Sequence, residues 1–239
     1  MTAEPLEKTS PWESVDDDLT SALEHLRRAL RVRDNDLQST LDAVAAEAVR
    51  MVDAAEFAGV NLFVRGKFLP QATYGVPIAE LDAFQLAHGI GPCIDSSRDQ
   101  KAIVSVSMEV EDRWAEFGPL AARLGVHSAL CVPLWVDDNQ LGSLSLYGST
   151  KSAFDERDEA VARLFALHAA IAIADTQRVQ NLQAALRNRD VIGQAKGILM
   201  ERRRMTADQA FDVLAQHSQR TNRKVFEIAE AFVMSGELA

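Results

Sequence analysis

The sequence predicts an α+β fold in which an antiparallel sheet with covering helices is followed by a long helix and an all-α module of three helices. The distribution of turn-forming residues is the main observation behind this prediction. All seven prolines lie at or before Pro133, and between Gly148 and Gly236 the only glycines are Gly193 and Gly197. Because turns and strand ends need these residues and helix interiors tolerate them poorly, the first part should be mixed α/β and the rest almost wholly helical.

The elements expected in the first part alternate between helical and strand patterns. Apolar residues spaced by three, four or seven over about 12–57 predict one amphipathic helix, or two with a break near 34–36. The other expected elements are a hairpin of 59–64 and 67–69, a helix over 78–88, an irregular segment over 89–95, a strand over 102–106, a short helix over 112–124, and two strands over 127–135 and 140–147. The last strand alternates polar and apolar residues, so the sheet should be antiparallel and half covered.

A long helix is expected from Asp155 to about Arg204, which corresponds to roughly 75 Å. That length exceeds a domain of this size, so the middle of the helix should lie against another helix. An imperfect apolar stripe suits a parallel coiled coil between two copies, or packing on the N-terminal helix: Ile171, Ala174, Val179, Leu182 and Leu186. A homodimer formed through residues 165–187 is the prediction, and a helix folded back on its own domain is the alternative.

Three short apolar stripes close the chain, and they can form one small core only by packing against each other. The second stripe follows a capping-box spacing in which Thr206 caps and Gln209 reaches back, and the third starts near Asn222, the expected N-cap. The apolar positions are Ile192, Ala195, Ile198, Leu199 and Met200 in the first stripe, Ala207, Ala210, Phe211 and Leu214 in the second, and Val225, Ile228, Ala229, Phe232 and Val233 in the third.

Charge is distributed unevenly along the chain. The formal net charge of −10 argues against a protein that coats nucleic acid or membrane with its whole surface. Residues 1–177 hold 15 Lys/Arg against 28 Asp/Glu, whereas residues 178–239 hold 10 against 7, so the net charge changes from −13 to +3. This asymmetry points to polyanion binding by the C-terminal part.

Basic and amide side chains of the C-terminal part form two groups that suit a phosphate-rich partner. In the first group, Arg189, Lys196 and Arg203 are seven apart and share one helix face. Gln194 lies in the same segment, and Arg204 lies beside its end. The second group, at the turn into the last helix, consists of Arg220, Asn222, Arg223 and Lys224. An ordinary solvated helix face is the alternative interpretation.

Gly193 and Gly197 are four residues apart and therefore lie on one helix face. Each costs about 1 kcal/mol relative to alanine in a helix interior. Close approach of a partner helix or of a nucleotide backbone is expected to offset this cost, and a chance pair is the alternative.

A dense set of motifs runs through residues 185–236: Ile192-Gly-Gln-Ala-Lys-Gly-Ile-Leu-Met-Glu-Arg202, Met205-Thr-Ala-Asp-Gln-Ala-Phe211, Leu214, Ser218 and Asn222-Arg-Lys-Val225. Together they closely resemble the ANTAR domain, a three-helix RNA-binding antitermination module. The resemblance implies binding to paired stem-loops with small loops in nascent transcripts, which stops a terminator from forming. It makes Lys196, Gly197, Arg203, Arg220, Asn222 and Arg223 the best candidates for contacting RNA.

Looser motifs run through the first part: residues 59–64, Tyr74-Gly75, Gly89-Ile-Gly-Pro92, Asp112-Arg-Trp114, Gly125-Val126, Val132-Pro-Leu134, Leu141-Gly-Ser-Leu144 and Phe154-Asp155. They resemble a GAF domain over about 36–176. GAF domains place small molecules between the sheet and covering helices, or bind nothing, so the resemblance leaves the ligand unknown.

The expected organisation is a disordered tail over 1–11, a GAF-like sensor domain with an N-terminal helix over 12–176, a helical linker or coiled coil over 177–190, and an ANTAR-like domain over 185–236. The expected function is signal-responsive, RNA-binding transcription antitermination. The alternative is a DNA-binding regulator with the same sensor, because three short helices can also form a helix-turn-helix.

No catalytic constellation stands out, and an enzyme is not expected. The five histidines are scattered without metal-ligand spacing. Cys93 lies in a Gly/Pro-rich segment where a thiol could react, with inert packing as the alternative, and Cys131 lies in an apolar strand that should be core. A GAF-fold methionine-sulfoxide reductase is a further alternative, but Cys93 has no resolving cysteine nearby in the sequence.

The expected location is the cytoplasm. The two cysteines lack a Cys-x-x-Cys spacing and indicate reduced thiols. The first ten residues lack the pattern of a signal peptide, and no stretch approaches about 18 apolar residues, so no contact with membrane is expected.

Overall fold

The computed structural model describes residues 36–64, 67–75 and 77–238. The chain divides into two compact units, Met1–Gln177 and Arg178–Ala239. The expected disordered tail over 1–11 and any helix before residue 36 lie outside the described residues.

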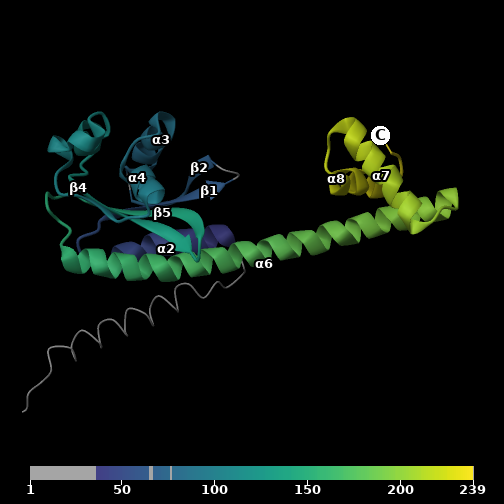
Figure 1. Ribbon diagram of the computed structural model, residues 1–239, viewed down its shortest axis with the longest axis horizontal. Helices are drawn as coiled ribbons and strands as arrows, with labels where there is room; N and C mark the ends of the chain where they lie inside the picture. The colour runs from purple at the N-terminus through teal and green to yellow at the C-terminus, as the bar shows by residue number, and fades with distance from the viewer. Residues whose placement is uncertain (1–35, 65–66, 76, 239) are drawn as a thin grey trace, which may run out of the picture. The chain divides into compact units, whose positions relative to one another are not determined.

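The first unit is built on a five-stranded antiparallel sheet with the strand order β2–β1–β5–β4–β3 (Figure 1). The strands are β1 (Phe57–Val64), β2 (Lys67–Tyr74), β3 (Ile103–Ser105), β4 (Ser128–Val136) and β5 (Asn139–Gly148). The predicted β1–β2 hairpin is confirmed, and the two strands expected over 127–135 and 140–147 form a second hairpin, β4–β5. The second one turns at Asp137, whose φ of 53° is a left-handed value that Asp tolerates better than most residues.

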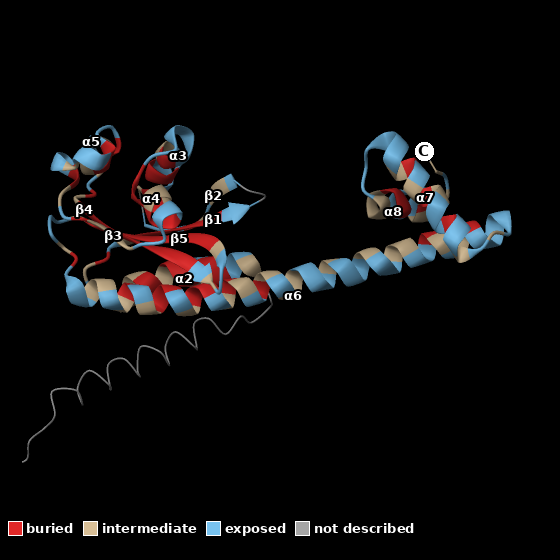
Figure 2. Cartoon of the chain, viewed as in Figure 1, coloured by how far each residue is buried: buried red, intermediate tan, exposed pale blue. Residues whose placement is uncertain are grey.

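Helices cover both faces of this sheet (Figures 1 and 2). The helical segments of the unit are α2 (Leu37–Met51), α3 (Ile78–His88), α4 (Pro92–Asp99), η1 (Met108–Val110), η2 (Asp112–Trp114), α5 (Phe117–Arg123) and the first part of α6 (Glu156–Arg203). On one face, α2 and α6 pack on alternate strand residues such as Leu144 and Leu146. On the other, α3 and α5 pack around Tyr147 and Ala129.

The expectation of a half-covered sheet was therefore wrong. Ser143 and Ser145, the polar positions of the alternating strand β5, are fully buried. The alternation separates an apolar layer under α2 and α6 from a partly polar layer under α3 and α4.

The segment after α3 also differs from the expectation of an irregular loop. It contains helix α4, which begins with Pro92 in its first turn after Gly91, whose φ is 137°. Proline is well suited to a first helical turn because it gives up no hydrogen bond there. The expected helix over 112–124 is interrupted, with η2 and α5 separated by two residues.

Helix α6 is continuous over 48 residues, as predicted. Its first part buries Phe165, Ala169 and Ile173 in the core shared with α2 and the sheet, and the Thr40 and Thr176 hydroxyls lie 3.5 Å apart. Burial is lowest in the middle of the helix and rises again near its C-terminal end (Figure 2). Leu182 is 62 % exposed and Leu186 is 48 % exposed.

The second unit is the expected three-helix module, formed by the end of α6 with α7 (Ala207–Thr221) and α8 (Val225–Ser235). The predicted capping box is present. The Gln209 backbone N–H donates to the Thr206 hydroxyl over 3.3 Å, and the Thr206 backbone N–H donates to the Gln209 side-chain oxygen over 2.9 Å. The buried core of this unit consists of Ala195, Leu199, Ala210, Leu214, Ile228, Ala229 and Phe232.

Three expectations for this unit were wrong. Asn222 is the C-cap of α7, with a left-handed φ of 52°, and Lys224 is the N-cap residue of α8. Asn serves either end of a helix because it tolerates the left-handed conformation as well as capping an N-terminus. Phe211 and Met200 lie at the edge of their apolar stripes and are 41 % and 38 % exposed.

Candidate nucleic-acid interface and ligand cavity

The first basic group lies on the exposed side of the C-terminal end of α6. Ala195 and Leu199 turn the opposite side of the helix into the core. Arg189 and Arg203 are exposed and Lys196 is half-buried. Within the part of the chain that the structure describes, Lys196 and Arg203 have no carboxylate within ion-pair distance, and Arg189 has only Asp190 at 3.9 Å. These cations are therefore open to an external anion.

Gly193 and Gly197 lie on the same exposed side, and the space beside them is open. A Cβ atom built on either glycine has no other heavy atom within 4 Å, apart from its own helix backbone and chain neighbours. Packing inside the described chain therefore gives no reason for these glycines.

A shallow hollow of about 610 Å³ borders this surface, lined by Gln194, Gly197, Ile198, Glu201, Arg202 and Val233. Arg202 is held there by contacts within its own unit. Its Nη1 donates to the Gly236 carbonyl, and its guanidinium lies 5.9 Å from the Phe232 ring centre. Gln194 is exposed and makes no hydrogen bond to described residues. Its amide can therefore meet a partner, as can the exposed carboxylate of Glu201.

The second basic group surrounds the turn between α7 and α8. The Arg223 backbone N–H donates to the Ser218 carbonyl over 3.2 Å, and the Ser218 hydroxyl donates back to the Arg223 carbonyl. Asn222 places the turn through its left-handed backbone while its side chain stays exposed. The structure thus brings Arg220, Asn222, Arg223 and Lys224 together at one tight turn.

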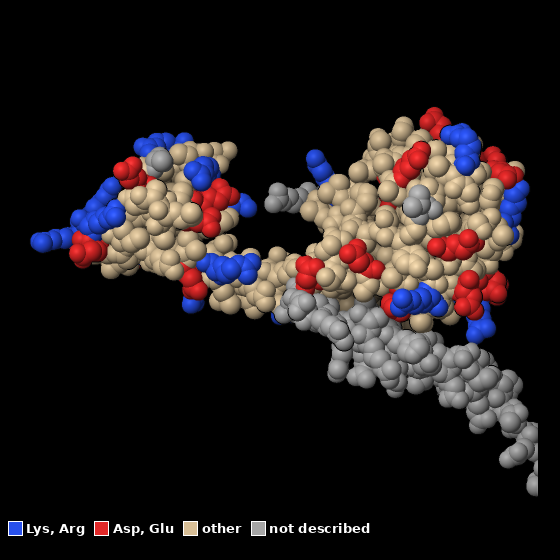
Figure 3. All heavy atoms as spheres, turned by 180° about the vertical axis from the view of Figure 1, so that it is seen from behind, with Lys and Arg blue, Asp and Glu red and all other residues tan. Residues whose placement is uncertain are grey.

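Among the described residues, Arg223 and Lys224 have only distant partners, whereas the Arg220 guanidinium lies within hydrogen-bond distance of His217. Arg223 Nε lies 3.9 Å from Glu227 Oε2, and Lys224 Nζ lies 5.8 Å from the Phe226 ring centre. Arg220 Nη2 lies 3.0 Å from His217 Nδ1. Arg204, the remaining candidate, is exposed just after α6. Figure 3 shows Lys and Arg in several groups on the visible face of this smaller unit, with Asp and Glu between them.

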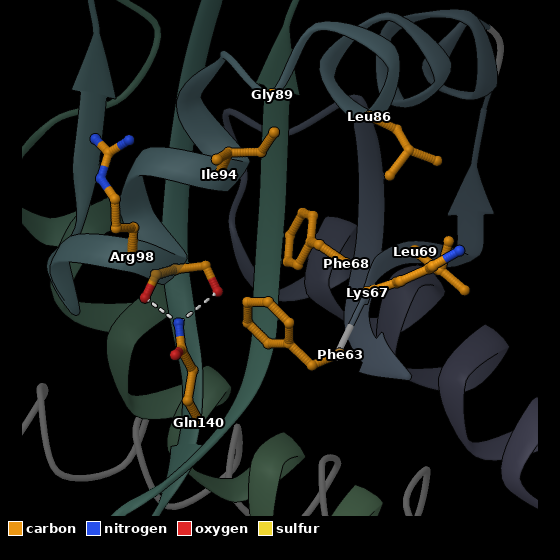
Figure 4. Close-up of a pocket in the computed structure, with 10 residues that line it drawn as sticks. Phe63, Lys67, Phe68, Leu69, Leu86, Gly89, Ile94, Arg98 and Gln140 are labelled. Carbon is orange, nitrogen blue, oxygen red and sulfur yellow. Dashed lines mark hydrogen bonds between the residues drawn. The ribbon is translucent and has the colours of Figure 1, made fainter. Parts of the chain in front are cut away.

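The first unit contains a cavity of about 760 Å³ between the β1–β2 hairpin, α3, α4 and the start of β5 (Figure 4). Its residues are Phe63, Lys67, Phe68, Leu69, Leu86, Gly89, Ile94, Ser97, Arg98 and Gln140. The Phe63 and Phe68 ring centres lie 5.1 Å apart with the planes tilted by 56°. No sequence motif identified this cavity, because its residues come from five separate elements.

A buried polar cluster lies between the sheet and helices α3 and α4. The Cys93 sulfur lies 2.8 Å from Ser145 Oγ and 3.3 Å from the Tyr147 hydroxyl, and it accepts from Gln85 Nε2 at 3.0 Å. Asn61 Nδ2 donates to Asp82 Oδ1 over 3.2 Å, whereas Asp82 Oδ2 has no partner among the described residues. Burial raises the pKa of Asp82 to about 7, partly offset by the Asn61 hydrogen bond.

Both cysteines are fully buried. Burial raises the pKa of the Cys131 thiol well above its usual value, so Cys131 stays protonated and a poor nucleophile. Cys131 is core, as predicted. Cys93 lies inside α4 and not in an open loop, which favours the packing alternative.

The described residues contain no group of three or more His, Cys, Asp or Glu side chains that could hold a metal ion. No described helix is both long and apolar enough to cross a membrane.

Comparison with known proteins identifies both units. The GAF domain family matches residues 34–174, and the ANTAR domain family matches residues 180–233. No curated protein sequence matches the chain. The ANTAR match marks the second unit as an RNA-binding antitermination module, and the GAF match marks the first as a sensor domain.

Solved structures support the fold of the first unit. The GAF domain of a phosphoenolpyruvate-protein phosphotransferase from Coxiella burnetii is 18 % identical, covers 69 % of this chain and 98 % of its own, and has a TM-score of 0.54. The corresponding Acinetobacter GAF domain is 16 % identical, with 67 % and 98 % covered and a TM-score of 0.53.

The similar structures also include enzymes. The free methionine-R-sulfoxide reductase from Neisseria meningitidis, solved with its substrate, is 15 % identical, with 75 % and 99 % covered and a TM-score of 0.52. At this identity the likeness concerns the fold alone. On the two family matches, the chain belongs to the GAF–ANTAR regulatory proteins, with an N-terminal GAF domain followed by a C-terminal ANTAR domain.

Proposed function

We propose that this protein is a signal-responsive antitermination regulator whose ANTAR unit binds paired stem-loops in nascent transcripts. The observation that carries the proposal is the exposed side of α6. There Lys196 and Arg203, which have no carboxylate within ion-pair distance in the described chain, accompany two glycines that no described residue packs against. The same unit holds the excess of positive charge, with 10 Lys/Arg against 7 Asp/Glu.

The chemistry of this surface suits RNA in two ways. Cationic donors lie along α6 at Lys196 and about two helical turns before and after it, at Arg189 and Arg203. Each phosphate that these cations neutralise releases counterions. The glycines remove side chains from the helix surface, so that a sugar–phosphate backbone can approach the helix closely. The exposed amides of Gln194 and Asn222 are suited to the unpaired base edges of a loop.

Binding of this kind changes which RNA structure forms. A protein that binds only the stem-loop stabilises it by about 2.7 kcal/mol when the free protein is at about 100 times Kd. If the stem-loop shares nucleotides with a terminator hairpin, that free energy shifts the balance away from the terminator. The GAF unit would set the amount of binding-competent protein in response to its signal.

Two titrations of the full chain test the proposal, one with a stem-loop RNA and one with duplex DNA of equal length. The RNA should bind at least about tenfold more tightly than the DNA, a difference of about 1.4 kcal/mol. Equal or tighter DNA binding would favour the helix-turn-helix alternative.

A matched pair of variants locates the surface. Arg203→Gln removes an exposed cation from α6, and Lys101→Gln removes an exposed cation from the GAF unit. Both change the net charge equally, so a purely global charge effect would weaken RNA binding by the same factor in both. The proposal expects weaker binding only for Arg203→Gln.

A further inference from the structure

We infer that Cys93 and Cys131 are a redox pair that a two-electron oxidant converts into a disulfide between helix α4 and strand β4. These are the only two cysteines of the chain, and both are free thiols in the structure. The inference concerns a chemical signal received by the GAF unit, and it stands whether or not the ANTAR unit binds RNA.

The fold brings together two cysteines that are far apart in the sequence. Cys131 lies opposite Ser145 in the register of β4 and β5, and the Cys93 sulfur lies 2.8 Å from Ser145 Oγ. One helical turn after Cys93, the Ser96 hydroxyl donates to the Cys131 carbonyl over 3.2 Å. This face of α4 therefore packs directly on the pair formed by Cys131 and Ser145.

The two thiols also contact each other. Burial raises the pKa of the Cys131 thiol, and a hydrogen bond with the Cys93 thiol raises it further. A disulfide forms without a large backbone movement only where the two side chains already point toward each other, and thiols joined by a hydrogen bond meet this condition. Cys131 thus supplies in space the second thiol that Cys93 lacks nearby in the sequence.

The first step of the oxidation takes place at Cys93, with hydrogen peroxide as the oxidant. The raised pKa keeps Cys131 protonated, so Cys93 reacts first. The Cys93 sulfur attacks one peroxide oxygen, the O–O bond breaks, and a sulfenic acid and a hydroxide form. The Cys93 proton passes to Asp82 Oδ1, which lies 4.0 Å from the sulfur, and from there to the hydroxide, which leaves as water.

Cys131 completes the reaction. Its sulfur attacks the Cys93 sulfur, the S–S bond forms as the S–O bond breaks, and the hydroxide leaves with the Cys131 proton as a second water. The two sulfur atoms together lose two electrons, which the peroxide gains. Two thiols and one hydrogen peroxide therefore give one disulfide and two waters.

Burial restricts which oxidant reaches the pair. Both side chains are fully buried, which makes them inert toward bulky reagents. Ile94, the residue after Cys93, lines the cavity of about 760 Å³ and points into it in Figure 4, so the open space begins one residue from the thiol. A molecule of about the size of water can approach Cys93 from there, whereas a large disulfide such as oxidised glutathione cannot reach either sulfur.

The disulfide should move α4 relative to the sheet. Bonded sulfur atoms are closer than hydrogen-bonded ones, so the new bond draws α4 toward β4. Asp95 follows Cys93 on α4, and its Oδ2 accepts a hydrogen bond of 2.7 Å from the Trp114 ring nitrogen. Because Trp114 is buried against this helix, its fluorescence should report the movement.

The test treats the reduced full-length protein with hydrogen peroxide under conditions that oxidise free cysteine completely. The protein is then unfolded, its remaining thiols are alkylated with N-ethylmaleimide, and a proteolytic digest is analysed by mass spectrometry. Neither cysteine should be alkylated, a peptide pair linked through Cys93 and Cys131 should appear, and a non-reducing gel should show single chains. Two alkylated cysteines, oxidised cysteines without a linked peptide pair, or a disulfide between two chains would overturn the inference.

Two single substitutions test the order of the steps. Cys131→Ser should stop at the sulfenic acid of Cys93, which dimedone traps, and Cys93→Ser should keep Cys131 as a thiol under the same treatment. Tryptophan fluorescence should change when peroxide is added to the parent protein but not when it is added to Cys131→Ser. Circular dichroism checks that both variants are folded. A folded Cys93→Ser protein that loses its thiol as fast as the parent protein would contradict the assignment.

Discussion

At the scale of single residues, the charge of the buried Asp82 side chain should make the stability of the protein depend on pH. It is 2 % exposed, and burial raises its pKa to about 7, whereas the unfolded chain has the ordinary value near 3.8. The folded state therefore keeps a proton that the unfolded state has lost between these two values. This contribution to stability is fully present below about pH 4 and is lost as the pH rises through 7.

The substitution Asp82→Asn removes that pH dependence. Relative to the parent protein, the variant should gain stability steadily between pH 4 and pH 7, by up to roughly 4 kcal/mol in total. Urea unfolding of both proteins at several pH values measures the difference. A difference that stays constant across this range would show that Asp82 titrates normally.

Leu214 and Phe211 test how well an apolar pattern predicts burial. Both lie on the expected stripe of α7, but Leu214 is fully buried and Phe211 is 41 % exposed. Leu214→Ala should therefore cost about 2–5 kcal/mol, whereas Phe211→Ala should cost clearly less. Thermal unfolding followed by circular dichroism distinguishes them. Equal losses would mean that Phe211 belongs to the core after all.

At the scale of elements, the sequence predicted those whose pattern is long or repeated. The β1–β2 and β4–β5 hairpins and the continuous helix α6 were all expected. Helix α4 was not expected, because Gly89, Gly91 and Pro92 are residues typical of a loop. Proline is also common in the first turn of a helix, which is where Pro92 lies. The burial of Ser143 and Ser145 could not be predicted, because covering helices distant in sequence decide it.

The candidate RNA surface was predicted to a similar extent. The seven-residue spacing places Arg189, Lys196 and Arg203 on the exposed side of α6. Two features could not be predicted from residue spacing. These are the hydrogen bond from Arg202 to the Gly236 carbonyl at the end of α8 and the C-cap position of Asn222, and both depend on tertiary contacts. The cavity of the GAF unit was outside the reach of motif analysis for the same reason.

The glycines of α6 should show opposite effects on stability and on binding. Alanine fits at Gly193 and Gly197 without a clash, so each substitution should stabilise the helix by about 1 kcal/mol. If an RNA backbone lies against these glycines, the added methyl groups should nevertheless weaken RNA binding. Asn181→Ala, at an exposed position of the same helix, is the control that should leave binding unchanged. Glycine variants that are more stable and bind RNA fully would show that the pair is accidental.

At the scale of the whole molecule, we propose that two copies associate through α6. Exposed Ile171, Leu182 and Leu186 form an apolar series that the described chain leaves uncovered. Light scattering should give twice the mass of a chain of 26.2 kDa. Replacing Leu182 and Leu186 by Lys should yield monomers, with Lys at exposed Asn181 and Gln183 as the charge-matched control. A monomeric parent protein at tens of micromolar, a concentration on the order of ordinary affinities, would exclude this dimer.

The measurement closest to the central claim is the affinity of the full chain for a stem-loop RNA across a series of salt concentrations. If several cations of the ANTAR unit contact phosphates, a plot of log affinity against log salt should have a slope of about −2 to −5. Arg203→Gln should make that slope shallower by about one unit if the residue meets a phosphate. Absent binding, or an affinity that does not change with salt, would contradict RNA recognition by this surface.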